Sequence, residues 1–335
     1  MPYIPKKVIW VPPTPEELIF EQIKVHRAIP VLGNSISNDL LLSNHRQLIL
    51  DFADHVDYPL ADKDNLAHIT QFVTIIQAKK EVSPVLVKRD YLDFIKSRLC
   101  DLAEADRVTG DLLDEVKAEF DNLDFSELAK RLGYPKFVNA TPDPLLILAG
   151  LNLPIYLTTG YHQIMEVALY KAGKRPHTGI CRWNRQLEKD IPDDIFASGY
   201  EPSVEEPLVY HLHGLDKYPT SLVLTEDDHL EFLVAISQEM GRPADRVHAK
   251  VREALTQCSL LLLGYNLQSW EFRTLFWGLL KFREIRQHGV HLQLNCEKEL
   301  DYLKIYMEKA DFEVSLESIQ DYTHKLYDKV IQVAP

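Results

Sequence analysis

Three stretches in the second half of the chain decide the fold: PIYLTTG at residues 154–160, VYHLHG at 209–214 and LLLLGYN at 260–266. Each is a short apolar run that ends abruptly in small, polar or imidazole side chains. Parallel strands buried on both faces have this pattern, and their carboxyl ends carry the ligand-binding groups of an α/β sheet. The three stretches therefore predict a parallel sheet with a site along one edge.

The segments around these stretches extend the same pattern. Further strands are predicted at 28–32, 178–182, 289–295 and 312–315, and helical spacing of apolar residues separates them. This alternation predicts a doubly wound, Rossmann-like α/β fold, with residues 1–335 as a single domain. Between residues 40 and 150 the spacing is almost entirely helical, which indicates a large helical insertion after the first strand. The alternative is an α/β domain whose loops bind nothing.

Composition narrows the function classes. The chain has 335 residues and a formal net charge of −13, which argues against a broad electrostatic contact with nucleic acid. Its four cysteines lie far apart and form no CxxC pair, so we expect no zinc ribbon, no metal and a reduced, cytoplasmic setting. No apolar run is long enough to span a bilayer, and we expect no membrane contact. The loop at 185–206, rich in proline and acids, is expected to cover the site.

The first predicted strand ends in a loop of small residues, GNSIS at 33–37, before a helical pattern begins. A strand, a small-residue loop and a helix N-terminus together offer free backbone N–H groups to a phosphate. The loop holds one glycine and is not the GxGxxG dinucleotide fingerprint. The alternative is a capped turn, in which Ser35, Ser37 or Asn38 closes the start of the helix.

These strand ends, in this order, resemble the sirtuin-like NAD-consuming domains. That family begins with an apolar strand and a Gly-Ala-Gly-x-Ser loop that cradles the NAD diphosphate. This chain matches at Gly33 and Ser37, and it carries Asn34 and Ser35 between them. The second strand end resembles the family motif Thr-Thr-Asn-Tyr-Asp-x-x-x-Glu, and the matching residues are Thr158, Thr159, Tyr161 and Glu166.

Two positions of the second motif depart from the family. Gly160 stands where the family has an asparagine that lies by the nicotinamide ribose and is needed for cleavage, and His162 stands where it has aspartate. His162 is either a solvent-exposed residue at a helix start or a replacement for the missing polar contact.

The third and fourth strand ends complete the resemblance. Residues 208–214 resemble the family's apolar strand ending in His-Gly, which makes His213 the candidate general base. In a strand His211 would share a face with His213; a core histidine is the alternative for either and is favoured for His211. GYNLQSWEFR at 264–273 resembles Gly-Tyr-Ser-Leu-x-Asp-x-x-Phe-Arg, a loop that receives the adenosine side of NAD. Its candidate contacts are Gly264, Tyr265, Asn266 and Ser269, although Ser269 could simply cap the next helix.

The resemblance implies two functions. In the first, the chain hydrolyses NAD to nicotinamide and ADP-ribose, with His213 as base and Asn34 or His162 compensating for the asparagine absent at 160. Such hydrolases are bacterial anti-phage defence effectors, controlled by homo-oligomerisation and sometimes by a separate sensor protein. In the second, a degenerate module binds NAD or an ADP-ribose-type nucleotide without cleaving it. A pure assembly domain is a third reading. The four-cysteine zinc module typical of deacetylating sirtuins has no counterpart in the cysteine spacing.

Overall fold

The computed structural model of the protein describes residues 14–42, 44–79, 83–137, 143–191, 194–238, 246–280, 289–294, 305, 307 and 312–331. Its described strands form one parallel sheet in the order β3-β4-β2-β1-β5-β6-β7. The strands are β1 (Ala28–Leu32), β2 (Ile155–Thr158), β3 (His177–Ile180), β4 (Leu208–His211), β5 (Ser259–Leu263), β6 (Val290–Gln293) and β7 (Phe312–Ser315). This order confirms the predicted α/β parallel sheet.

The order of the strands identifies where ligands bind in such a fold. After β1 the chain continues to β2 on one side, whereas after β5 it continues to β6 on the other. The direction of winding therefore reverses between β1 and β5, and the crevice beyond their carboxyl ends is the expected ligand site. β1 pairs with β5 along all five residues but with β2 only from Val31 onward. Pro30, which has no N–H to donate, lies just before that second pairing.

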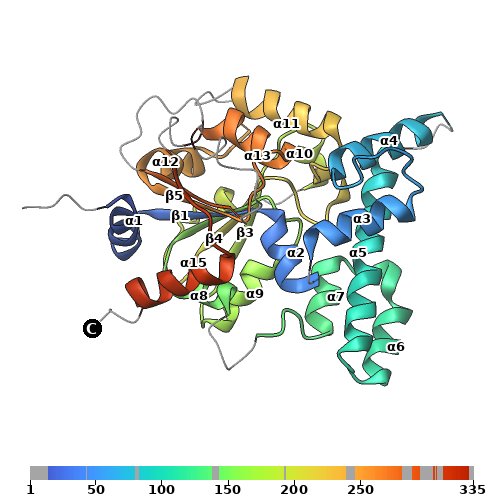
Figure 1. Ribbon diagram of the computed structural model, residues 1–335, viewed down its shortest axis with the longest axis horizontal. Helices are drawn as coiled ribbons and strands as arrows, with labels where there is room; N and C mark the ends of the chain where they lie inside the picture. The colour runs from blue at the N-terminus through green and yellow to red at the C-terminus, as the bar shows by residue number, and fades with distance from the viewer. Residues whose placement is uncertain are drawn as a thin grey trace, which may run out of the picture.

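Helices cover both faces of the sheet (Figure 1). One face carries α11 (Glu226–Gln238), α12 (Ala249–Gln257) and α13 (Trp270–Leu275), and the other carries α8 (Pro144–Gly150), α9 (Ile164–Lys171) and α15 (Ile319–Leu326). Each layer buries its own apolar cluster against the sheet. The remaining elements outside the insertion are α1 (Pro15–Lys24), α2 (Asn34–Leu42), α10 (Leu187–Asp190), η2 (Ile195–Ser198), η3 (Pro219–Ser221), the π-helical η4 (Phe276–Leu280) and the π-helical η5 (Tyr327–Ile331).

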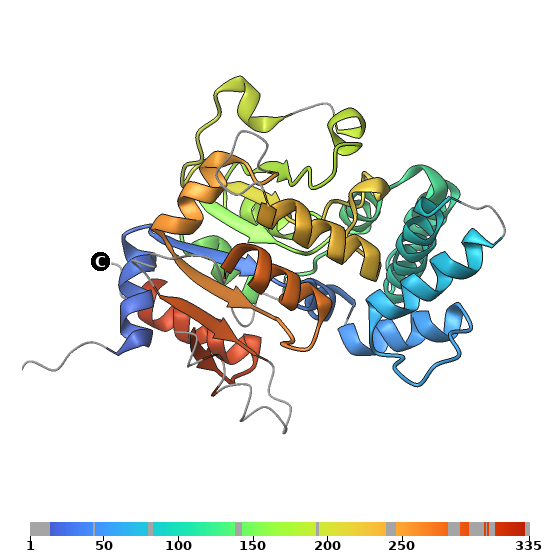
Figure 2. The same cartoon turned by 90° about the horizontal axis from the view of Figure 1, so that it is seen from above.

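The predicted helical stretch after β1 is present. It comprises α3 (His45–His55), α4 (Leu66–Ala78), α5 (Val85–Ala105), α6 (Gly110–Ala118), η1 (Phe120–Asn122) and α7 (Phe125–Arg131). These helices form a separate layer beyond α2, next to the carboxyl ends of the strands (Figures 1 and 2). Asn44, Asn65 and Asp124 cap three of them through their side chains. The insertion therefore lies beside the edge of the sheet where the sequence predicts the site.

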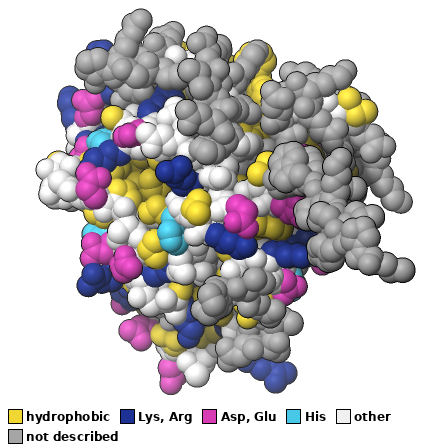
Figure 3. Space-filling model, turned by 90° about the vertical axis from the view of Figure 1, so that its left-hand side faces the viewer, with side chains coloured by type: hydrophobic (Ala, Val, Ile, Leu, Met, Phe, Trp, Pro, Cys, Tyr) yellow, Lys and Arg dark blue, Asp and Glu magenta, His cyan; other side chains and the backbone are white. Residues whose placement is uncertain are grey.

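Some boundaries differ from the prediction. The helical spacing of apolar residues predicts helices over 242–257 and 297–310. The first begins only at Ala249, where His248 caps it through its side chain, and residues 239–245 lie outside the described part. The second falls almost wholly outside the described residues. Among the helices that the structure describes, none is long and apolar enough to cross a membrane. On the face away from the insertion, described acidic and basic side chains are interspersed (Figure 3).

Candidate functional site

The carboxyl ends of β1 and β5 meet through two glycines. The Gly33 N–H donates to the Leu263 carbonyl at 2.8 Å, and a Cβ at position 33 would lie 2.5 Å from the Gly264 carbonyl oxygen. Gly264 has φ +71°, and a Cβ there would collide with Ile36. The Ser35 hydroxyl donates to the Gly264 carbonyl. Glycine is therefore required at both positions by the contact between the two loops themselves.

The first N–H of α2 already has an anionic partner. The Asn34 N–H donates to Oε1 of Glu271, the second residue of α13, at 2.7 Å. The Thr159 hydroxyl donates to the same carboxylate oxygen, and it also lies 3.2 Å from the Tyr265 hydroxyl. A carboxylate at the N-terminus of a helix is stabilised by the helix dipole. Glu271 thus occupies the position where the sequence predicts a diphosphate.

This arrangement corrects the capped-turn alternative for residues 33–38. α2 begins directly at Asn34, so Ser35, Ser37 and Asn38 lie inside the helix and none of them is its cap. Burial raises the pKa of Glu271, while the hydrogen bonds from Thr159 and Asn34 act in the opposite direction. Asn34 is itself buried, and its side-chain oxygen has no hydrogen-bond partner.

The β2 end places Gly160 against α2. Its N–H donates to the Thr158 hydroxyl at 2.8 Å, and its carbonyl lies 3.0 Å from Nδ1 of His211. A Cβ at position 160 would lie 3.1 Å from Oγ1 of Thr158 and 3.2 Å from Oγ of Ser37. A side chain at 160 would therefore enter a narrow space whose walls are two hydroxyl groups.

His162 follows the β2 end and is buried, so the alternative of a solvent-exposed residue is wrong. Its ring stacks at an angle on Phe125 of α7, with centroids 5.1 Å apart, and its Nε2 lies 3.4 Å from Oδ1 of Asn38. Nδ1 has no partner. Burial, followed by the nearby His211, lowers the pKa of His162 to about 3. The ring is therefore neutral at physiological pH, and its free nitrogen can accept or donate one hydrogen bond.

His211 and Glu166 form a buried pair below the β2 end. Nε2 of His211 lies 2.9 Å from Oε1 of Glu166, and the Thr178 hydroxyl donates to the same oxygen at 2.8 Å. Burial lowers the pKa of His211, but the Glu166 charge and the hydrogen bonds to Glu166 and Gly160 outweigh it, so the pKa is raised. With both ring nitrogens bonded to acceptors, His211 acts as a structural imidazolium that holds the Gly160 carbonyl. This agrees with the core interpretation favoured for it.

His213 has a different environment from His211, because β4 ends at His211 and residues 212–213 turn. The prediction that the two histidines share a face is therefore wrong. The His213 ring packs edge-on against His229 and Phe232 of α11, with centroids 5.3 Å and 4.8 Å away. It is 1% exposed, and among the described residues neither ring nitrogen has a hydrogen-bond partner. Burial, followed by His229, holds its pKa well below the usual value.

The β5 loop holds the remaining predicted contacts. Asn266 is exposed, and its side chain accepts from the Gln268 N–H at 2.8 Å. Ser269 is the N-cap of α13 and accepts from the Phe272 N–H at 3.1 Å, which confirms its capping role. Tyr265 is buried and lies beside Thr159. Of the predicted residues, those at the β1, β2 and β5 ends are therefore linked by contacts, whereas His213 lies among α11 residues and Asn266 faces solvent.

Two further residues contribute to this edge, Glu271 and His229, and no distinctive local pattern in the sequence marks them, since an acid and a histidine on helices have no distinguishing spacing. The Trp270 ring stacks near His229, with centroids 6.3 Å apart. The only local signal for Glu271 is its position in the first turn of a helix, two residues after Ser269, the candidate N-cap.

The molecule is thus an α/β protein whose polar strand ends converge at the switch point of a parallel sheet. Residues 154–315 match the family model of the SIR2-like domain, a similarity that suggests a sirtuin-like, NAD-related function. The match spans β2 to β7 and leaves β1, α2 and the helical insertion outside it. No curated protein matches the chain.

The residues at this edge fit a nucleotide such as NAD in part. Asn34, His162 and His213 each carry a buried polar atom without a partner, and a ligand rich in hydroxyl, amide and phosphate groups would satisfy such atoms. The Asn34 N–H, by contrast, is occupied by Glu271. A diphosphate at α2 therefore requires the Glu271 carboxylate to move.

Proposed function

We propose that the protein binds NAD across the carboxyl ends of β1, β2, β4 and β5 and hydrolyses it to nicotinamide and ADP-ribose. The observation that supports this best is the His213 imidazole, which is buried and has no hydrogen-bond partner at either nitrogen within the part of the chain that the structure describes. A buried polar group without a hydrogen bond costs about 1–3 kcal/mol, so a purely structural histidine would be expected to have a partner, as His211 has.

In this proposal the diphosphate lies at Asn34 to Ser37, where the α2 N-terminus favours an anion. Gly33 and Gly264 hold that loop, and Thr158, Thr159 and Gly160 face the ribose beside it. The adenosine side lies toward Tyr265, Asn266 and Ser269. This assignment follows the family resemblance position by position, and it takes β1 and the insertion as parts of one domain with residues 154–315.

The reaction adds water across one bond. The bond between the ribose C1′ and the nicotinamide nitrogen breaks, nicotinamide leaves with the bonding electrons, and the water oxygen bonds to C1′. In this proposal His213 accepts the proton that the water releases; burial keeps its ring neutral before the reaction but also makes it a weaker base than a free imidazole. Asn34 Oδ1 and the free nitrogen of His162 are the groups proposed to orient the ribose in place of the asparagine absent at 160.

A second candidate function is a binding module that holds NAD or an ADP-ribose-type nucleotide uncleaved. Gly160 favours it, because the residue needed for cleavage in the family is absent at a position with little free space. Glu271 also favours the binding module, since its carboxylate occupies the α2 N-terminus and must leave it before a nucleotide phosphate can bind there.

The biological role belongs to the same proposal and rests on the family resemblance. An NAD hydrolase of this type would act as a cytoplasmic antiviral defence effector, assembled as a homo-oligomer and triggered by a separate sensor protein.

Calorimetric titration with NAD and with ADP-ribose, followed by chromatography of the same samples for nicotinamide, tests the proposal. Binding with nicotinamide release supports the hydrolase, and binding without release supports the module. Absence of both, at several protein concentrations to cover oligomeric states, would overturn both.

A further inference from the structure

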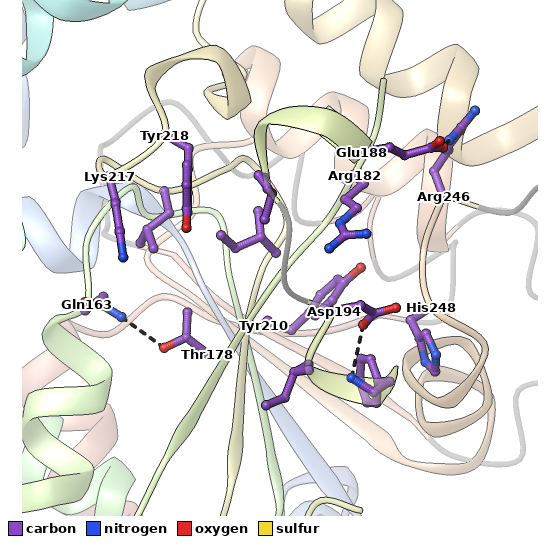
Figure 4. A pocket seen from close by; sticks show the side chains of 16 residues that line it. Gln163, Thr178, Arg182, Glu188, Asp194, Tyr210, Lys217, Tyr218, Arg246 and His248 are labelled. Carbon is purple, nitrogen blue, oxygen red and sulfur yellow. Dashed lines mark hydrogen bonds and ion pairs between the residues drawn. The ribbon is translucent and has the colours of Figure 1, made fainter. Parts of the chain in front are cut away.

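A pocket of about 400 Å³ lies at the open edge of the sheet, beside β3 (Figure 4). It is lined by the β3–β4 end of the sheet, by the segment that contains α10 and η2, and by the loop that follows β4. None of its lining residues belongs to the helical insertion or to the proposed NAD contacts. The pocket lies within the range of roughly 300–1,000 Å³ that small-molecule sites occupy. The 185–206 loop, expected to cover the predicted site, contributes to this pocket through residues such as Asp194.

The pocket carries positive charge that its own acids do not neutralise. Arg246 pairs with Glu188, with 2.6 Å between Nη1 and Oε1, and Asp194 accepts the Phe196 N–H at 3.0 Å. Among the described residues, Arg182 and Lys217 have no carboxylate within ion-pair distance. In a chain of net charge −13, two uncommitted cations at one pocket point to an anion as ligand.

Arg182 gives the strongest indication. Its Nη2 is buried and has no hydrogen-bond partner among the described residues. The guanidinium points into the pocket, and the Lys217 ammonium enters from the opposite side next to the Tyr218 ring (Figure 4). A buried guanidinium nitrogen without an acceptor is costly, and phosphate oxygens match its planar donor geometry. A phosphate group on Arg182 would satisfy this nitrogen, and Lys217 adds positive charge at the opposite wall of the pocket.

The rest of the lining suits a flat ring with hydroxyl groups. Tyr210 and Tyr218 line the pocket, and the Phe196 ring stacks on His248 with centroids 3.7 Å apart. At the other wall, Nε2 of Gln163 donates to the Thr178 hydroxyl at 3.0 Å, which leaves the Gln163 carbonyl oxygen as an acceptor. Aromatic surfaces recognise bases by stacking, and amide or hydroxyl groups recognise sugar hydroxyls.

From these observations we infer that the pocket beside β3 binds a nucleoside monophosphate, with the phosphate on the Arg182 guanidinium, the Lys217 charge at the opposite wall favouring the anion, and the base against the aromatic wall. The inference is independent of NAD hydrolysis, because it uses other residues and another edge of the sheet. It predicts a second ligand site in the SIR2-like segment.

Isothermal titration of the full chain with AMP tests this inference, with adenosine and inorganic phosphate as partial ligands. AMP is expected to bind more tightly than either partial ligand. Arg182→Met, which keeps an unbranched apolar stem and removes the guanidinium charge, should weaken AMP binding about tenfold or more. Lys217→Gln, at an exposed position that the fold tolerates, should weaken it several-fold.

Arg185→Met and Lys189→Gln are matched controls, since both residues are exposed, lie on the same segment and do not line the pocket. They should bind AMP as the natural chain does. Two results would overturn the inference. One is that the natural chain does not bind AMP; the other is that Arg182→Met and Lys217→Gln both bind AMP as tightly as the natural chain. The second result would mean that AMP occupies the proposed NAD cleft or another site. If Arg182→Met fails to fold, the comparison of AMP affinity between Lys217→Gln and its control Lys189→Gln decides the test.

Discussion

At the scale of the residue, position 160 separates the two candidate functions. The sequence identified Gly160 as a departure from the family, but it could not show what surrounds it. The structure adds that the hydroxyls of Thr158 and Ser37 border the space where a side chain would go. The contacts are tight, and the Thr158 hydroxyl oxygen also accepts the Gly160 N–H, so a side chain at 160 requires the Thr158 and Ser37 side chains to shift by a few tenths of an ångström.

Gly160→Asn is therefore expected to fold and to raise nicotinamide release from NAD, because it restores the amide that the family uses beside the ribose. Its midpoint of thermal unfolding should fall slightly, as the new Cβ crowds Ser37. Gly160→Ala supplies the same Cβ without the amide. It should lower the midpoint of thermal unfolding to a similar extent and leave nicotinamide release unchanged. Equal release by the asparagine and alanine variants would rule out a role for the amide.

The buried pair of His211 and Glu166 gives a prediction about pH. The folded pKa of His211 is raised, so its contribution to stability is fully present below the unfolded value of about 6.5 and is lost as pH rises through the folded value. Glu166→Gln should cost on the order of 3 kcal/mol at pH 6, because it leaves a buried charge without its partner. Urea unfolding at pH 6 and 9 measures this cost. A cost that grows from pH 6 to 9 would contradict the pairing.

At the scale of the element, the sequence predicted strands and helices well and contacts between them poorly. The described strands coincide with the predicted ones, which in the three opening stretches are 154–159, 207–212 and 259–264, to within two residues at each end. Buried parallel strands are marked by continuous apolar runs. The start of α2 was misread, since its acceptor is Glu271, 237 positions further along the chain. No local pattern encodes a partner at that distance.

The contact between α2 and α13 predicts that the Glu271 carboxylate lowers the affinity for a nucleotide. If the diphosphate takes the Asn34 N–H, then Glu271 competes for the same donor and repels the same charge. Glu271→Ala should tighten NAD binding several-fold in a calorimetric titration. Glu231→Ala, an exposed glutamate on α11, is the control and should leave the dissociation constant unchanged. Weaker binding in Glu271→Ala would show that this carboxylate supports the ligand rather than excluding it.

At the scale of the whole molecule, Asp216 joins the helical insertion to the sheet. Its Oδ2 accepts from the Ser126 N–H at 2.6 Å and from the Ser126 hydroxyl at 2.7 Å, and its own N–H donates to the Tyr161 carbonyl at 2.7 Å. Burial, followed by the nearby Asp124, raises the pKa of Asp216 to about 7. The sequence predicted the insertion but not this junction, since a single aspartate in a loop has no distinctive pattern.

The raised pKa of Asp216 fixes the sign of a pH effect. Between the unfolded value of 3.8 and about 7 the folded protein holds a proton that the unfolded chain has released, so this contribution to stability falls as pH rises through that window. Asp216→Asn has no ionisable carboxyl group at this position, so this contribution does not change with pH in the variant. The free energy of unfolding of the natural chain, relative to this variant, should therefore fall between pH 4 and 7 by roughly 1.4 kcal/mol per pKa unit of the shift. A constant difference across that range would contradict the assignment.

The central claim, NAD hydrolysis with His213 as base, is tested most directly by nicotinamide release from NAD by the natural chain and by His213→Ala. The claim predicts steady release by the natural chain and a loss of about a hundredfold or more in the variant, with thermal stability and NAD affinity largely retained. His324→Ala, on α15 and away from the strand ends, should release nicotinamide at the natural rate. Equal release by the natural chain and His213→Ala would contradict the claim.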